Sequence, residues 1–187
     1  MNRTITALLL CSAACTATAE IMVPMHLVNE QGVGEGIGHI TVSQTTHGIQ
    51  LKPDLRDLPP GMRGFHLHEK GNCETTKKDG KITPAGAAGS HYDPDGSDKH
   101  GAPWGDGHKG DLPGLYVNTT GTSTQPLVAS RLTMEEFYGR ALVIHAGGDN
   151  YSDFPDPLGG GGARIACGVI PTPDTSNTAA QTSSDSE

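Results

Sequence analysis

The sequence predicts an all-β protein, an antiparallel sandwich or barrel, and two observations carry this prediction. The 187 residues include 26 Gly and 13 Pro, together about a fifth of the chain. Both residue types are unfavourable inside helices, so the composition argues against a helical bundle or a coiled coil. About eight short segments alternate apolar and polar residues between Gly, Pro and Asp, which is the pattern of antiparallel strands joined by turns.

The individual elements follow from this alternation. The strands that we expect are 21–28, 39–43, 49–51, 64–68, 115–117, 127–132, 141–145 and 165–170. A Gly-rich turn at Gly32–Gly38 leads into the second strand, and Thr133–Glu136 has the Thr-x-x-Glu spacing of a capping box that begins a short helix. Segments 71–114 and 147–163 show no periodicity, and loops of that length are uncommon unless they have a function.

Residues 1–19 predict a secretory signal peptide. A basic start precedes the apolar run Ile5–Ala14, which is too short to span a membrane, and Ala17–Ala19 has the small-residue pattern of a cleavage site. We therefore expect a periplasmic or secreted protein with no membrane span, although Cys15 leaves open a lipid-anchored form. At the other end, 171–187 carries no large apolar residue and is predicted to be a disordered tail.

The remaining domain, 20–170, contains one pair of cysteines. In an oxidising compartment, Cys73 and Cys167 predict a disulfide that closes a loop of about 95 residues. The formal net charge of −8 argues against a nucleic-acid partner, because no basic surplus is present to meet phosphate groups. The composition is unusual instead in its nine histidines.

Two groups of histidines are spaced as metal ligands. His66 and His68 lie two apart on an expected strand, so both rings project from one face, and His145 ends another strand. Each of these signals is weak alone, since strand histidines are more often structural. The second group lies in the aperiodic segment 71–114, at spacings of nine, eight and three residues: His91, His100, His108 and Asp111.

The donor set of the second group suits tetrahedral zinc, because it combines three imidazoles with one carboxylate. Imidazoles without a thiolate favour copper or zinc over an iron–sulfur cluster or calcium. The segment has no apolar pattern with which to fold alone, and a bound metal would organise it. The alternative is a solvated loop with scattered histidines.

These residues lie within motifs that resemble the secreted bacterial copper–zinc superoxide dismutases. The resemblance spans about 36–170 and is carried by five stretches: Gly64–Glu69, Ala88–Pro94, His108–Pro113, His145–Asn150 and Gly161–Ile170. It implies a flattened eight-stranded Greek-key β-barrel with two long functional loops. It also implies one copper and one zinc per chain, with superoxide as the substrate.

The resemblance assigns the metal ligands. It implies copper ligation by His66, His68, His91 and His145, and zinc ligation by His91, His100, His108 and Asp111. His91 belongs to both sets, because a deprotonated imidazole can bond one metal through each ring nitrogen. Asp149 is implied to be a carboxylate that joins His66 to His100 and orients both rings. The Cys73–Cys167 pair matches the family's disulfide within the subunit.

The implied reaction is superoxide dismutation by alternating reduction and oxidation of copper, with zinc structural. In the family mechanism His91 leaves copper on reduction and carries a proton, and Arg164 attracts the anion. An acidic protein repels superoxide on average, so the attraction must be local. We hypothesise that four lysines supply this field together with Arg164: Lys70, Lys77, Lys78 and Lys81. The alternative is a solvated lysine loop without a kinetic role.

Two other functions remain open at this point. One is a non-catalytic copper-binding or copper-delivery protein on the same fold, although such proteins usually lack a copper ligand or the active-site arginine. The other is a purely structural zinc domain, which would leave His66, His68 and His145 unexplained.

A few residues match no position in these schemes. His26, His39 and His47 are expected to be surface or strand histidines, with a weak auxiliary copper site near the N-terminus as the alternative. Trp104, the only tryptophan, either anchors the interface of a homodimer or packs into the core or as a cap on its loop.

Overall fold

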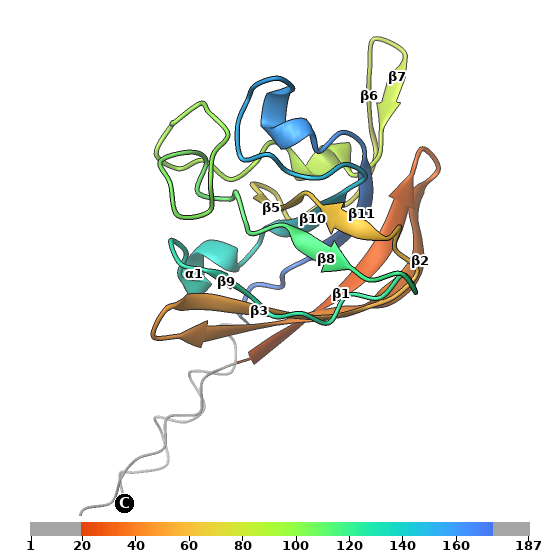
Figure 1. Cartoon of the computed structure of the whole chain (residues 1–187). Helices are drawn as coiled ribbons and strands as arrows, with labels where there is room; N and C mark the ends of the chain where they lie inside the picture. The colour runs from red at the N-terminus through yellow and green to blue at the C-terminus, as the bar shows by residue number, and fades with distance from the viewer. Residues whose placement is uncertain (1–19, 174–187) are drawn as a thin grey trace, which may run out of the picture.

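The computed structural model describes residues 20–173; the predicted signal peptide and residues 174–187 of the predicted tail lie outside the described residues. The regular secondary structure of the described part is almost entirely β, with two short 3-10 helices and one short α-helix, and long loops join the strands (Figure 1). In chain order the elements are β1 (Glu20–Asn29), β2 (Gly32–Thr45), β3 (Gly48–Leu55), β4 (Gly61–Arg63), β5 (Phe65–His68), β6 (Thr76–Lys78), β7 (Lys81–Thr83), η1 (Gly86–Ala88), β8 (Leu115–Val117), β9 (Leu127–Ala129), α1 (Met134–Phe137), β10 (Ala141–His145), η2 (Pro157–Gly160) and β11 (Arg164–Val169).

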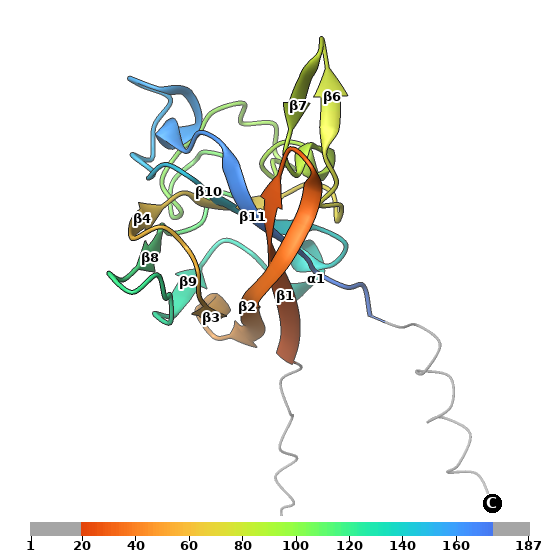
Figure 2. The ribbon, with the colours of Figure 1, turned by 90° about the vertical axis from the view of Figure 1, so that its right-hand side faces the viewer.

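Seven strands form one curled antiparallel sheet in the order β5-β10-β11-β1-β2-β3-β9. Because the sheet curls, its β5–β10–β11 end lies above its β1–β2–β3 end as half of a barrel (Figure 1). Strands β4 and β8 form a separate pair, and the β6–β7 hairpin projects away from the sheet (Figure 2). The prediction of an all-β barrel-like fold is confirmed.

The core lies between the two ends of this sheet. Strand β3 shows the reason, because its buried side chains Ile49, Leu51, Pro53 and Leu55 alternate with partly or fully exposed ones. From the opposite end, Phe65, Leu67, Leu142 and Ile144 join the same apolar cluster as Val23, Met25, Ile40 and Leu51. The alternate side chains of β5 must therefore point out of the core, beneath the two long loops.

Two details of the sequence prediction are wrong. Gly32–Gly38 is the first part of strand β2 rather than a turn, paired to β1 through two shifts of register. Gly38 has φ +118°, and a Cβ there would lie 2.0 Å from the carbonyl oxygen of Asp54, so close pairing with β3 requires glycine. The aperiodic segment 71–114 contains the β6–β7 hairpin, whose exposed, lysine-rich strands carry no apolar alternation.

The predicted helix start and the predicted disulfide are both confirmed. The Thr133 backbone N–H donates to the Glu136 carboxylate over 3.0 Å, which is one half of a capping box at the start of α1. Cys73 and Cys167 are bonded, with their Cα atoms 5.8 Å apart. The bond ties the segment after β5 to strand β11, across 94 residues of sequence.

The close approach at Gly38 gives a testable prediction. We expect Gly38→Ala to destabilise the protein by at least about 2 kcal/mol more than Gly32→Ala, because only the first Cβ meets backbone atoms. Gly32 has nearly the same φ, +119°, but has nothing within 4 Å of its Cβ position, so it reports backbone strain alone, of about 1 kcal/mol. Guanidinium unfolding of both variants measures the difference. Equal losses would contradict the steric explanation.

Candidate metal centre

The strands bring four histidines together as a first cluster, defined as His66, His68, His91 and His145. His66 and His68 lie on the face of β5 turned away from the core, and β5 is hydrogen-bonded to β10, which ends at His145. His91 comes from the loop, through an isolated bridge to His68. All four side chains are buried, and one ligand atom of each lies within 4.8 Å of the others.

A second cluster, defined as His91, His100, His108 and Asp111, surrounds one carboxylate oxygen. Asp111 Oδ1 lies 2.9 Å from His91 Nδ1, 3.0 Å from His100 Nδ1 and 3.4 Å from His108 Nδ1. Around a tetrahedral ion with bonds of about 2.0–2.1 Å, neighbouring ligand atoms are separated by about 3.4 Å. The second cluster therefore has the size of a zinc site, with the loops already folded around it.

His91 links the two clusters, and His66 cannot do the same. His66 Nε2 is hydrogen-bonded to Asp149 Oδ2 over 2.8 Å, so only its Nδ1 is free, although the ring lies near His91, His100 and Asp111 as well. His66 stacks on His91 with ring centroids 3.9 Å apart. His108 joins the second cluster through Asp111, since its Nδ1 lies 3.4 Å from Asp111 Oδ1.

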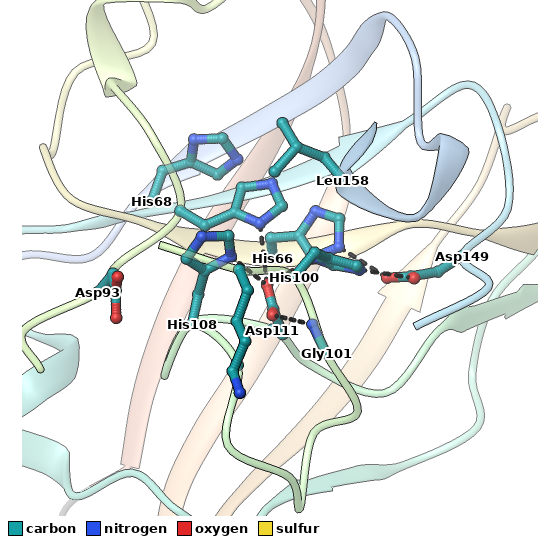
Figure 3. Close-up of polar contacts among 12 residues, drawn as sticks. His66, His68, Asp93, His100, Gly101, His108, Asp111, Asp149 and Leu158 are labelled. Carbon is teal, nitrogen blue, oxygen red and sulfur yellow. Dashed lines mark hydrogen bonds and ion pairs between the residues drawn. The ribbon is translucent and has the colours of Figure 1, made fainter. Parts of the chain in front are cut away.

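Asp149 lies between the clusters, where the sequence predicted it. Its Oδ2 accepts from His66 Nε2 and its Oδ1 accepts from His100 Nε2, both over 2.8 Å (Figure 3). Two carboxylates flank the ring of His100: Asp149 accepts from its Nε2 over 2.8 Å, and Asp111 Oδ1 lies 3.0 Å from its Nδ1, a buried nitrogen without a hydrogen-bond partner in the described part of the chain. One buried carboxylate therefore fixes the rotation of a ring in each cluster.

The hydrogen bonds also fix which nitrogen of each ring can bind a metal. His68 Nδ1 donates to the carbonyl of Gly89 over 2.9 Å, and His145 Nδ1 donates to the carbonyl of Gly162 over 3.2 Å. Since a carbonyl only accepts, Nδ1 of each ring carries the proton and Nε2 keeps its lone pair. Four buried nitrogens in the first cluster have no hydrogen-bond partner among the described residues: His66 Nδ1, His68 Nε2, His91 Nε2 and His145 Nε2. Four imidazole lone pairs directed to one buried point fit copper or zinc.

Burial keeps the first cluster neutral. Loss of solvation lowers the pKa of His66, His68 and His91 below the ordinary value, and lowers the pKa of His145 to about 4. A neutral imidazole is the form that binds a metal ion.

In the second cluster, carboxylates shift the pKa of His100 in the other direction. Burial lowers the pKa of His100, but the nearby carboxylates of Asp111 and Asp149 outweigh this effect and raise that pKa to about 9. Burial alone would raise the pKa of Asp111, but its contacts with the rings of His100 and His91 outweigh this effect and hold the pKa well below the usual range. Asp111 therefore remains ionised, as a metal ligand requires.

Arg164 lies at the mouth of this centre. It lines a pocket of about 480 Å³ together with His91, His145 and Leu158. Its guanidinium donates from Nη1 to the carbonyl of Ala85 over 2.5 Å and from Nη2 to the carbonyl of Gly89 over 2.6 Å. The Gly89 carbonyl is the one that also accepts from His68, so a metal-site ring and a cation share an anchor.

Of the four lysines singled out from the sequence, Lys81 shares a groove with Arg164. Lys77, Lys78 and Lys81 are exposed on the β6–β7 hairpin, and Lys81 lines a groove of about 490 Å³ together with Arg164. Lys70 is exposed, with its ammonium 3.6 Å from the Glu69 carboxylate.

The remaining histidines and the tryptophan lie outside the two clusters. His26 and His39 are on strands β1 and β2, and His47 is in the turn after β2. Trp104 is 73% exposed, so it does not pack into the core, and its ring lies 6.2 Å from that of Tyr151. Among the described helices, none is long and apolar enough to cross a membrane.

Several residues that build the site could not be found from their sequence pattern alone. Gly159, with φ +70°, passes so close that a Cβ would lie 2.2 Å from Asp149 Oδ1. Asp153 accepts from the backbone N–H of His100 over 2.8 Å, which joins the segment 147–163 to the second cluster. The only signal for Gly159 is the run of four glycines in which it stands; Asp153 has none, because its contact is long-range.

The Asp149 bridge leads to a prediction about metal affinity. Asp149→Asn keeps the shape but replaces one acceptor by an amide donor, which faces a ring N–H. We expect the zinc affinity of the metal-free protein to fall about 10- to 100-fold. Asp156→Asn makes the same charge change in the same exposed loop without touching either histidine, and should leave the affinity unchanged. Competition with a chromophoric chelator measures both, and equal losses would argue for a general charge effect.

Comparisons with known proteins agree with this geometry. The model of the family described as copper/zinc superoxide dismutase (SODC) matches residues 37–170. The chain is 50% identical to a superoxide dismutase [Cu-Zn] of Escherichia coli K12. The aligned 167 residues cover 89% of this chain and 95% of that protein. Among solved structures, a Cu/Zn superoxide dismutase from Brucella abortus is similar with a TM-score of 0.80 and 47% identity, over 81% of this chain and 99% of that one. The monomeric copper, zinc superoxide dismutase from Salmonella enterica is similar with a TM-score of 0.75 and 51% identity, over 81% of this chain and 99% of that one.

Proposed function

The chain belongs to the copper/zinc superoxide dismutase family and is an oxidoreductase that acts on superoxide; within that function, we propose specific roles for its residues. The first cluster holds copper through His66 Nδ1 and through Nε2 of His68, His91 and His145. The second cluster holds zinc through His91, His100, His108 and Asp111. The observation that carries this assignment is the position of His91, whose Nε2 belongs to one cluster and whose Nδ1 belongs to the other.

The reaction converts two superoxide anions and two protons to one dioxygen and one hydrogen peroxide. Bound copper supplies the redox chemistry by alternating between Cu(II) and Cu(I), whereas zinc has no redox chemistry and is structural. His91 contributes a proton site at Nε2 and is held in place through Nδ1 on the zinc side. Asp149 keeps His66 and His100 in their orientations, so that both clusters would retain their spacing with the metals bound.

Arg164 binds the anion. Its guanidinium is half-buried at the mouth of the pocket, where water competes less for its hydrogen bonds than on an open surface. The presence of all four first-cluster histidines together with this arginine favours the enzyme over a non-catalytic copper-binding or copper-delivery protein of the same fold. A purely structural zinc domain would leave the four free nitrogens of the first cluster without a purpose.

The enzyme assignment is tested by metal analysis and substitution of Arg164. The wild-type chain should contain one copper and one zinc and should dismutate superoxide rapidly. Arg164→Gln should lower the rate about tenfold or more, with unchanged metal content, because a local cation raises the rate of anion capture. Arg164→Lys keeps the positive charge, so its dismutation rate should lie between those of the wild type and Arg164→Gln. A wild-type protein that contains zinc but no copper and does not dismutate superoxide would contradict the enzyme assignment.

We propose further that Lys70, Lys77, Lys78 and Lys81 steer superoxide toward Arg164. The hairpin that carries three of them borders the same groove as the arginine, and the segment 147–163 contains no Lys or Arg. In a protein of formal charge −8, this local positive region opposes the average repulsion of an anion.

The steering proposal predicts a change in salt dependence. Replacing all four lysines by Gln should lower the rate at low ionic strength and flatten its decrease with added salt, since screening acts on exposed charges. The control is the double variant Lys52→Gln and Arg56→Gln, which removes two exposed cations on and beside β3. The change in rate is compared between the two variants per charge removed. An unchanged rate and salt slope in the fourfold variant would refute steering by these lysines.

We also propose the location and assembly of the protein. Residues 1–19 direct export to the periplasm or beyond the cell, with attachment through a lipid on Cys15 as the alternative form. The exposed apolar side chains of Met62 and Tyr116, which face each other across the β4–β8 pair, together with Trp104 support a homodimer. The Salmonella enterica relative, in contrast, is described as monomeric.

A further inference from the structure

The loop that carries His100 and His108 has little regular structure of its own. Within the described residues, 99–110 contains no helix or strand, and a few backbone contacts close the loop on itself. The His108 N–H donates to the carbonyl of Lys99 over 2.9 Å. The backbones of Gly101 and Gly107 touch, since a Cβ on Gly107 would lie 2.5 Å from the Gly101 nitrogen. These contacts fix the neck of the loop but not its position on the barrel.

Arg131 connects this loop to the barrel. It lies in the turn between β9 and α1, and its guanidinium donates three hydrogen bonds to loop carbonyls. Nε donates to Pro103 over 2.9 Å, Nη1 to Gly107 over 3.1 Å and Nη2 to His108 over 2.6 Å. A planar guanidinium with donors in a fixed arrangement can hold three carbonyls at once, which an ammonium on a flexible chain cannot do with the same geometry.

The three carbonyls belong to both arms of the loop. One is the carbonyl of His108 itself, and another belongs to Gly107, which packs against Gly101, the residue after His100. The Gly101 N–H in turn donates to Asp111 Oδ2 over 2.9 Å (Figure 3). A single side chain on the barrel therefore sets the backbone positions of two ligands relative to the carboxylate that is the third.

We propose that Arg131 is a positioning residue that preorganises the zinc site, an inference that rests on the assignment of the second cluster as zinc ligands. Because Arg131 holds the backbones at His108 and Gly107, the loop does not need to be ordered by the metal when zinc binds. Arg131 touches no residue of the first cluster through these bonds, and His66, His68 and His145 stand on strands or strand ends. Its effect is therefore specific to zinc.

The test compares Arg131→Gln, Arg131→Lys and Arg140→Lys. Arg140→Lys serves as the control, because the half-buried guanidinium of Arg140 donates to the carbonyls of Glu136 and Tyr138 in its own segment, and its contact with the Tyr92 ring, 3.8 Å from the centroid, is a cation–π contact that lysine can also make. Zinc affinity is measured on metal-free protein by competition with a chromophoric chelator. We expect a decrease of about 10- to 100-fold for Arg131→Gln, as for other groups that support metal ligands, and a smaller decrease for Arg131→Lys.

Two further measurements separate positioning from general stability. Copper(II) affinity of the zinc-free protein and the unfolding midpoint of the metal-free protein should be the same in Arg131→Gln and Arg140→Lys. Parallel losses of zinc affinity, copper affinity and unfolding midpoint would overturn the proposal, as would an Arg131→Gln protein that binds zinc like the wild type. If Arg131→Gln does not fold, Arg131→Lys decides by the same comparison. A wild-type chain that binds no zinc would instead reject the ligand assignment on which the proposal rests.

Discussion

The alternation of side chains along β5 is the constraint on which the rest of this centre depends. Phe65 and Leu67 are fixed in the core, so His66 and His68 must leave the strand on the opposite face. A slip of one residue would bury two imidazoles in the apolar core and expose two large apolar side chains, which no compensating contact could offset. The hydrophobic core thus determines the position of the first two ligands, and the hydrogen-bonded neighbour β10 adds His145.

The loops are organised by a different kind of interaction. The segments that carry His91, His100 and His108 contribute little apolar surface, and polar side chains hold them in place instead. Asp149 joins the two clusters, Asp153 holds a backbone N–H of the loop, and Arg131 holds three of its carbonyls. Each of these contacts is buried or half-buried, where hydrogen bonds to charged groups are worth more than on an open surface. The strands hold the first-cluster residues of β5 and β10, and a small number of charged side chains hold the loops in position above them.

The extent to which the sequence predicted the molecule follows from this division. The strands with an apolar side, such as β3, and the local capping box of α1 were found because their signal is contained in neighbouring residues. The β6–β7 hairpin was missed because both of its faces are polar, and Gly32–Gly38 was misread because glycine serves turns and close strand pairing alike. The metal-site residues could be grouped through their motifs. The contributions of Arg131 and Gly159 depend on contacts distant in sequence, for which spacing contains no information.

The carbonyl oxygen of Gly89 joins two functions in one peptide unit. It accepts a hydrogen bond from the ring of His68 and another from the guanidinium of Arg164. Any motion of this peptide therefore changes the orientation of the His68 ring together with the location of Arg164, the cation that we propose binds the anion. Through this shared acceptor, the orientation of the ring and the position of the guanidinium depend on the same peptide unit. A substitution that displaces Gly89 would consequently impair both properties in the same step, and neither could be adjusted separately through this part of the chain.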